Sequence, residues 1–126
     1  MPALFFAANG FHPHAYQSLL RPLLSRYQFY SPLLRALWRP EPTPIIRTWF
    51  PFVSDAKLAI DQLQSGPYVG VGHSIGATVL LKLALDYPDC FTKLILIEPA
   101  LFTKKMSVFY RVLASMGLGY AIHPLI

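Results

Sequence analysis

The sequence predicts an α/β fold, in which a mostly parallel β-sheet is flanked by helices. Residues 68–97 alternate strand, helix and strand, and this order builds parallel sheets covered by helices. Residues 3–8 form a further apolar run that ends at Asn9-Gly10, as expected of a buried strand followed by a turn. The 126 residues contain no repeat and no linker rich in serine or glycine, which indicates one domain's worth of chain.

The segment after the first strand is predicted to be helical but interrupted. Residues 14–27 carry apolar side chains at helical spacing, with Pro22 inside the pattern. A proline there removes a backbone donor and clashes with the preceding turn, so it should kink or split the helix. Residues 29–38 fit a strand that becomes either a loop or a short helix, and the prolines of residues 39–44 indicate a loop.

An amphipathic helix is predicted before the second apolar strand. Residues 45–53 are expected to be extended, as far as Pro51 allows. Residues 54–64 then place apolar side chains on one helical side, and Ser54 or Asp55 could cap the first turn.

The clearest pattern lies in the strand–helix–strand unit. A short strand is expected at residues 68–72, a helix with one apolar face at residues 75–87, and a buried strand at residues 93–97. Such units are right-handed in nearly all proteins. Residues 101–126 are apolar and basic, with a helical stretch near residues 108–116.

The sequence Gly72-His73-Ser74-Ile75-Gly76 matches the pattern G-x-S-x-G, with a strand running into it and a helix leaving it. We expect a sharp turn that holds Ser74 in strained backbone geometry and exposes its hydroxyl. Gly72 and Gly76 are needed because strand and helix cross closely there. The N–H of Ile75, at the positive end of the helix, would point to where an oxyanion forms. An ordinary tight turn is the alternative.

On these residues the chain resembles the α/β-hydrolase superfamily, particularly its small serine esterases and lactonases. GHSIGATVLLKLALDYPD and FTKLILIEPALF are similar to its elbow, helix and next strand, and FFAANGFHPHAYQSLLRPL is similar to its oxyanion loop. The resemblance covers most of residues 3–102 and implies a partial α/β-hydrolase core at 1–101, followed by the start of a helical cap at 102–126. It also implies that the N–H of Phe11 is the second oxyanion donor, although the family more often has His-Gly-Phe there. An ordinary turn at Asn9-Gly10 after the strand is the alternative.

The base and acid that a serine nucleophile needs are harder to assign. In the family pattern an acid and then a histidine follow the serine. Glu98 and His123 are weak candidates, because Glu98 fits an ordinary strand end and His123 falls in the cap region. The chain therefore looks like the N-terminal half of a hydrolase that lacks its acid and base.

Composition argues against several other classes of protein. The net charge is +5, but the arginines are spaced singly along apolar segments, unlike a nucleic-acid-binding surface. No apolar run is long enough to span a membrane, and the single cysteine, Cys90, fits a reducing, cytoplasmic location. Neither a metal-ligand spacing nor a phosphate-binding glycine loop is present, so no metal or cofactor is expected.

The sequence thus favours a serine hydrolase of small ester-like, hydrophobic substrates that acts through an acyl-enzyme on Ser74. The isolated chain is expected to be inactive or very weak. The alternative is a non-catalytic module that associates with itself or with a partner through an exposed sheet edge and apolar surface.

Overall fold

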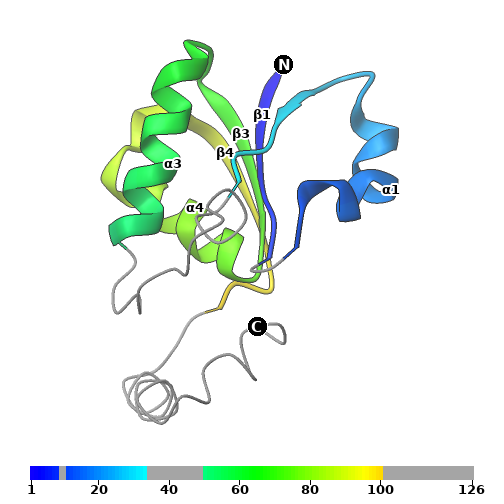
Figure 1. The fold of residues 1–126 in the computed structure, drawn as a ribbon. Coiled ribbons are helices and arrows are strands. Elements are labelled where there is room, and N and C mark those ends of the chain that lie inside the picture. Colours follow the sequence, from blue (N-terminus) through cyan, green and yellow to red (C-terminus); the bar gives the residue numbers. More distant parts are fainter. Residues whose placement is uncertain (9–10, 34–49, 101–126) are drawn as a thin grey trace, which may run out of the picture.

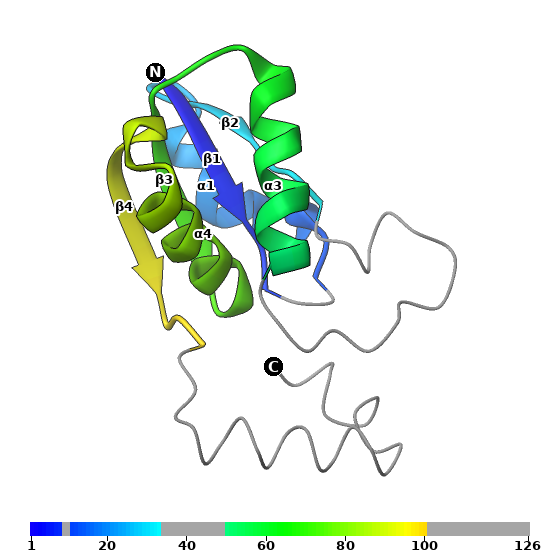
Figure 2. The same ribbon diagram turned by 90° about the vertical axis from the view of Figure 1, so that its left-hand side faces the viewer.

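A computed structural model describes residues 1–8, 11–33 and 50–100, which form three layers (Figure 1). The middle layer is a four-stranded sheet in the order β2-β1-β3-β4, and every neighbouring pair in it is parallel. Helices α3 and α4 cover one face, where they lie side by side (Figure 2), and the short helical segments around α1 cover the other. The predicted parallel sheet with flanking helices is confirmed.

The sheet consists of short strands, and the side chains of residues 3–6 in the central strand β1 are fully buried. The strands are β1 (Pro2–Phe6), β2 (Gln28–Tyr30), β3 (Tyr68–His73) and β4 (Phe91–Ile97). Alternate side chains of β1 enter two apolar clusters, because successive residues of a strand point to opposite faces. Leu4 and Phe6 pack under α3 and α4, whereas Ala3 and Phe5 pack on the side of α1.

The helical region after β1 is divided, as Pro22 predicted. A 3₁₀ turn at Pro13–Tyr16 leads into α1 (Gln17–Leu20), and a second 3₁₀ turn at Arg21–Leu23 contains the proline. The predicted helix to residue 27 is therefore too long, since regular helical structure ends at Leu23.

Helix α3 (Phe50–Leu63) begins earlier than the sequence suggested, and the expectation of extended backbone is wrong for residues 50–53. Pro51 lies in the first turn, where its missing N–H costs no helical hydrogen bond. Val53 is buried on the same face as Ala56 and Ile60, at spacings of three and seven residues. Burial of this longer face explains the early start; residues 45–49 lie outside the described part.

Helix α4 (Ile75–Asp86) connects β3 to β4 through a 3₁₀ turn at Pro88–Cys90. Its predicted apolar face is confirmed, since Val79, Leu80 and Leu83 are fully buried. The larger apolar cluster joins these side chains to α3 and to Leu4, Phe6 and Tyr68 of the sheet. This packing fixes where α4 begins relative to the sheet, and hence the position of Ser74.

Strand β4 is not the fully buried strand that its composition suggested. Thr92, Lys93 and Ile95 are exposed, Ile95 to 46%. The reason is position: within the described residues β4 pairs with β3 on one side only and forms an edge of the sheet. An apolar sequence predicts a strand well, but it cannot show which strand lies at an edge.

Candidate active site

The candidate site lies where the connections of the sheet diverge. From β1 the chain crosses one face to reach β2, and it then returns across the opposite face through α3 to reach β3 on the other side of β1 (Figures 1 and 2). In open parallel sheets, ligands bind at the carboxyl ends of the strands on either side of such a switch point. Here those ends belong to β1 and β3, and Ser74 directly follows β3.

Ser74 forms a one-residue turn between strand and helix. It follows His73, the last residue of β3, and precedes Ile75, the first residue of α4. Its backbone angles are φ 54° and ψ −119°, a region that residues with a side chain rarely adopt. Ser74 is half-buried. The predicted strand–serine–helix geometry is therefore present, whereas the nucleophilic role remains a prediction.

Backbone hydrogen bonds hold the elbow to the end of β4. The N–H of Ser74 donates to the Ile97 carbonyl at 3.0 Å. The Ser74 carbonyl accepts from the N–H of Thr78 at 3.1 Å and from that of Ala100 at 3.3 Å. The buried Thr78 hydroxyl donates to the Ala100 carbonyl at 2.8 Å, which fastens the chain after β4 to α4.

The two motif glycines lie where no side chain would fit. A Cβ on Gly76 would come within 2.3 Å of the Phe6 carbonyl oxygen and 2.4 Å of the Ala7 carbonyl oxygen. A Cβ on Gly72 would come within 2.7 Å of the Ala77 Cα. All of these contacts are with backbone atoms, which cannot move aside as side chains do. The predicted close crossing is present, and it also brings the start of α4 against the end of β1.

The two predicted oxyanion donors differ in their surroundings. Ile75 opens α4, whose first N–H groups have no acceptor within the helix and lie at its positive end. Phe11 is 47% exposed, and its N–H donates to the Ala8 carbonyl at 3.1 Å. Binding an oxyanion through Phe11 would therefore require this amide to leave, or to share, its present acceptor.

Tyr16 and His73 form a contact at this end of the sheet that the sequence did not reveal. The Tyr16 hydroxyl accepts from the N–H of Ala8 at 3.0 Å and lies 2.8 Å from His73 Nδ1. The His73 ring meets the Tyr16 ring edge-to-face, and Tyr16 packs against the apolar cluster on the α1 side of the sheet. The alternation of Val69, Val71 and His73 along β3 indicates that face, but no local pattern indicates Tyr16, 57 residues away.

The weak acid and base candidates stay untested. Glu98 follows β4 directly, is exposed, and adopts a left-handed φ of 44°. His123 and the predicted cap at 102–126 lie outside the described residues. His12 and His14 are exposed, and the N–H of His14 donates to His12 Nδ1 at 3.2 Å.

Among the described residues there is neither a cluster of metal-ligating side chains nor a helix suited to span a membrane. In that part of the chain no three His, Cys, Asp or Glu side chains gather closely enough to hold a metal ion. None of the helices described has the length and apolar character needed to cross a membrane.

Comparison with protein families gives a match over nearly the whole chain. The profile described as "Alpha/beta hydrolase family" matches residues 3–125. Among curated proteins, a type I acyl-CoA thioesterase of Penicillium brevicompactum is 28% identical over 78 residues. That match covers 60% of this chain but 18% of the thioesterase.

Solved structures share the fold. A thermophilic esterase from Thermogutta terrifontis superposes with a TM-score of 0.77 at 20% identity, over 92% of this chain and 44% of the esterase. A thioesterase domain from the curacin biosynthetic pathway gives 0.72 at 22% identity, over 94% of this chain and 46% of that domain. At these identities the likeness concerns the fold alone, and the chain spans less than half of either structure.

Proposed function

The chain belongs to the α/β-hydrolase family, and we propose that it carries the nucleophile of a serine hydrolase, with Ser74 attacking the carbonyl carbon of an ester-like substrate. The observation that carries this proposal is the strained φ of 54° at Ser74, between the end of β3 and the start of α4. Strain of this kind costs about 1–3 kcal/mol and persists only where the surrounding structure enforces it. An ordinary strand-to-helix turn has no need of it.

The proposed chemistry is acyl transfer through a covalent intermediate. The Ser74 oxygen forms a bond to the acyl carbon while a base accepts the hydroxyl proton, and the carbonyl oxygen becomes an oxyanion. The N–H groups of Ile75 and Phe11 would hold that oxyanion; one such donor contributes about 3 kcal/mol to transition-state stabilisation. The intermediate then expels its alcohol or thiol, which takes the proton, and water releases the acid from Ser74.

The base and its orienting acid are assigned in this proposal to polypeptide beyond these 126 residues. In support, the chain spans less than half of the solved structures that share its fold. Oxygen esters and thioesters present the same acyl carbonyl to the serine, and both esterases and thioesterases occur among the similar proteins. We therefore propose an acyl ester or acyl thioester as the substrate class, with an apolar acyl group.

A fluorophosphonate probe tests the nucleophile, because it bonds covalently to activated serines. We expect slow labelling at Ser74, located by mass spectrometry of peptides, and none in Ser74→Ala. Ser18→Ala removes an exposed serine from α1 and should label as the unchanged protein does. Absence of labelling in a folded chain would contradict the proposal.

Turnover of an activated aryl ester tests the assignment of the base. Without a base, a serine hydroxyl is a weak nucleophile, so the 126-residue chain should turn over the ester very slowly or not at all. Vigorous turnover that disappears in Ser74→Ala would show that these residues already contain a base.

A second candidate function, self-association without catalysis, has one observation in its favour. Strand β4 exposes Ile95 at an edge of the described sheet, and such edges invite pairing with another strand. A folded protein that forms concentration-dependent assemblies and resists the probe would favour this function over the first.

A further inference from the structure

We propose that Tyr16 and His73 are a positioning pair that ties the end of β1 to the serine elbow and thereby orients the amide of Phe11. The inference deepens the proposed function and rests on it, because Phe11 matters chemically only if Ser74 is a nucleophile. Neither side chain is assigned a role in the steps described above. Both lie between the two segments that would supply the oxyanion donors.

The contacts form a continuous chain of hydrogen bonds from the elbow to Phe11. The N–H of Ala8 donates to the Tyr16 hydroxyl at 3.0 Å, and the N–H of Phe11 donates to the Ala8 carbonyl at 3.1 Å. The Tyr16 oxygen lies 2.8 Å from His73 Nδ1, and we assign the Tyr16 proton to this contact, which leaves the imidazole proton on Nε2. Ala8 is thus held through both its N–H and its carbonyl.

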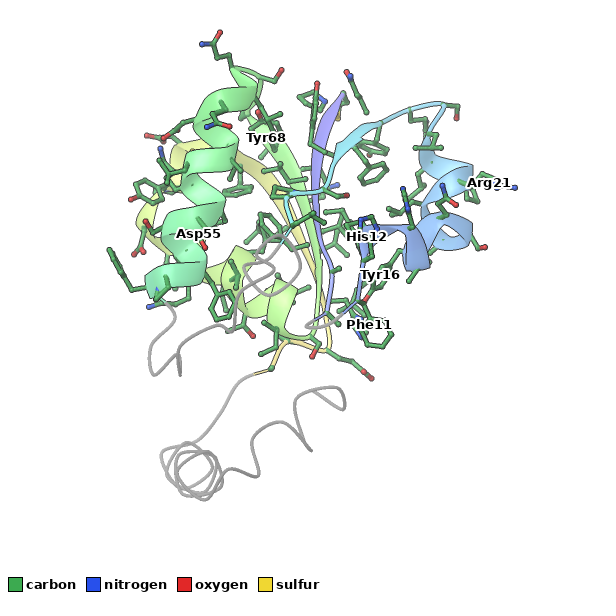
Figure 3. The ribbon with its side chains drawn as sticks, in the orientation of Figure 1. Phe11, His12, Tyr16, Arg21, Asp55 and Tyr68 are labelled. Atoms are coloured by element: carbon green, nitrogen blue, oxygen red, sulfur yellow. The ribbon has the colours of Figure 1, made fainter. Side chains whose placement is uncertain are left out.

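The Tyr16 ring packs against two aromatic neighbours, which limit its movement. The ring centroid lies 4.6 Å from that of the fully buried Phe5, at an interplanar angle of 60°. It lies 5.8 Å from the His73 ring in an edge-to-face arrangement at 71°. In Figure 3 Tyr16 lies on the side of the sheet that carries the helical segments around α1. A ring held in this way has little freedom to release Ala8.

The Tyr16–His73 pair links the end of β1 to the end of β3. These are the two segments whose relative position would define an oxyanion site. His73 is adjacent to Ser74, while Ala8 lies three residues before Phe11. The elbow already presses Gly76 against the carbonyls of Phe6 and Ala7, so the end of β1 is fixed from the side of α4. Tyr16 fixes it from the side of α1. Anchoring Ala8 from both faces fixes where the Phe11 amide lies relative to Ser74. To hold an oxyanion, that N–H would then share its hydrogen bond with the Ala8 carbonyl.

Nuclear magnetic resonance of the ¹⁵N-labelled 126-residue chain tests the pair without depending on catalysis. In neutral His73 we expect the Nε2-protonated tautomer, with Nδ1 shifted by an accepted hydrogen bond. Tyr16→Phe should remove that shift, move the amide signals of Ala8 and Phe11, and speed hydrogen exchange at Ala8 about tenfold or more. Tyr27→Phe removes a hydroxyl from the same apolar cluster and should change none of these signals. An Nδ1-protonated ring, or unchanged signals in Tyr16→Phe, would overturn the inference.

Variants of His73 separate positioning from simple packing. His73→Asn keeps an acceptor oxygen near the place of Nδ1 and should preserve the Phe11 amide signal. His73→Leu keeps the bulk but offers no acceptor, and it should reproduce the effect of Tyr16→Phe on Phe11. Equal behaviour of the two variants would mean that the hydrogen bond does not position the segment, and the inference would fail.

Labelling at Ser74 distinguishes failure of this inference from failure of the proposed function. If both hold, Tyr16→Phe and His73→Leu should react with the fluorophosphonate about three- to tenfold more slowly than the unchanged chain, while His73→Asn and Tyr27→Phe match it. Equal labelling rates in all variants would overturn the pair's role while leaving Ser74 a nucleophile. A chain that shows the expected amide signals but never labels would support the pair as an anchor of Ala8 and contradict the proposed function.

Discussion

Ser74 combines a strained backbone with a position at the switch point of the sheet. The strain is enforced from outside the residue: its N–H is bound by Ile97, and its carbonyl by Thr78 and Ala100. Replacing Ser74 changes two properties that can be separated, the hydroxyl and the tolerance of a positive φ. A pair of substitutions distinguishes them.

Ser74→Gly should raise the free energy of unfolding by about 1 kcal/mol relative to Ser74→Ala, because glycine adopts a φ of 54° without a steric penalty. Both variants lack the hydroxyl, so neither should react with the probe. Urea denaturation followed by circular dichroism gives the difference in stability. Equal stability of the two variants would show that the backbone at Ser74 carries no strain.

The buried environment of Tyr68 also has a measurable consequence. It is 1% exposed, and within the described residues its hydroxyl has no hydrogen-bond partner of ordinary geometry. Burial raises the pKa of the Tyr68 phenol, although the nearby backbone of Ser65 partly opposes the rise. Burial has the larger effect on this pKa, because the side chain is almost completely enclosed.

The raised pKa of Tyr68 predicts a loss of stability in alkali. Below about pH 10 the phenol is protonated in both the folded and the unfolded chain, so it adds no pH dependence. Above that pH the unfolded chain releases the proton while the folded chain retains it, and the free energy of unfolding falls. Tyr68→Phe should reduce this fall and leave stability near neutral pH equal or about 1 kcal/mol higher. Tyr87→Phe, at the surface, should leave the alkaline fall in place.

At the scale of elements, the crossing of β1, β3 and α4 decides the shape of the site. Gly72 of β3 pairs with Phe6 of β1 on one side and with Leu96 of β4 on the other. The elbow therefore leaves from the centre of the sheet. Helix α4 then passes directly over the end of β1. The glycines of the motif therefore serve packing between elements as well as the turn itself.

Gly76→Ala should destabilise the chain far more than Gly70→Ala. The new Cβ at residue 76 would meet backbone carbonyls at 2.3 and 2.4 Å, whereas at residue 70 it would meet the ends of the Leu80 and Leu94 side chains at 2.7 to 3.1 Å. Side chains can shift, so we expect a cost of about 1–3 kcal/mol for Gly70→Ala and more than about 3 kcal/mol for Gly76→Ala. Thermal unfolding measures both; a smaller cost at residue 76 would contradict the close crossing.

At the scale of the whole molecule, the described sheet ends on one side at β4. Strand β4 contributes seven residues, pairs with β3, and exposes Ile95 together with Thr92 and Lys93. Because an unpaired strand edge can add another strand, this edge is where we expect contact between chains.

Ile95→Lys tests this edge. A charged side chain on an edge strand discourages pairing with another strand, so the variant should self-associate less than the unchanged chain at equal concentration. Sedimentation velocity over a concentration series gives the comparison, and Leu58→Lys on the exposed side of α3 serves as the control. Identical association by Ile95→Lys and the unchanged chain would exclude β4 as the contact.

The local sequence determined the parts of this protein that depend on short-range chemistry. Apolar runs gave the strands, Pro22 divided the helical segment, and the G-x-S-x-G pattern between strand and helix gave the strained turn at Ser74, because spacing and backbone preference act over a few residues. Tertiary structure decided the rest. The early start of α3 follows from burial of Val53, and the exposure of β4 follows from strand order. The meeting of Tyr16 with His73 follows from packing of the segment after β1 against the sheet. Such contacts join residues far apart in sequence, and no local pattern records which of them will pack together.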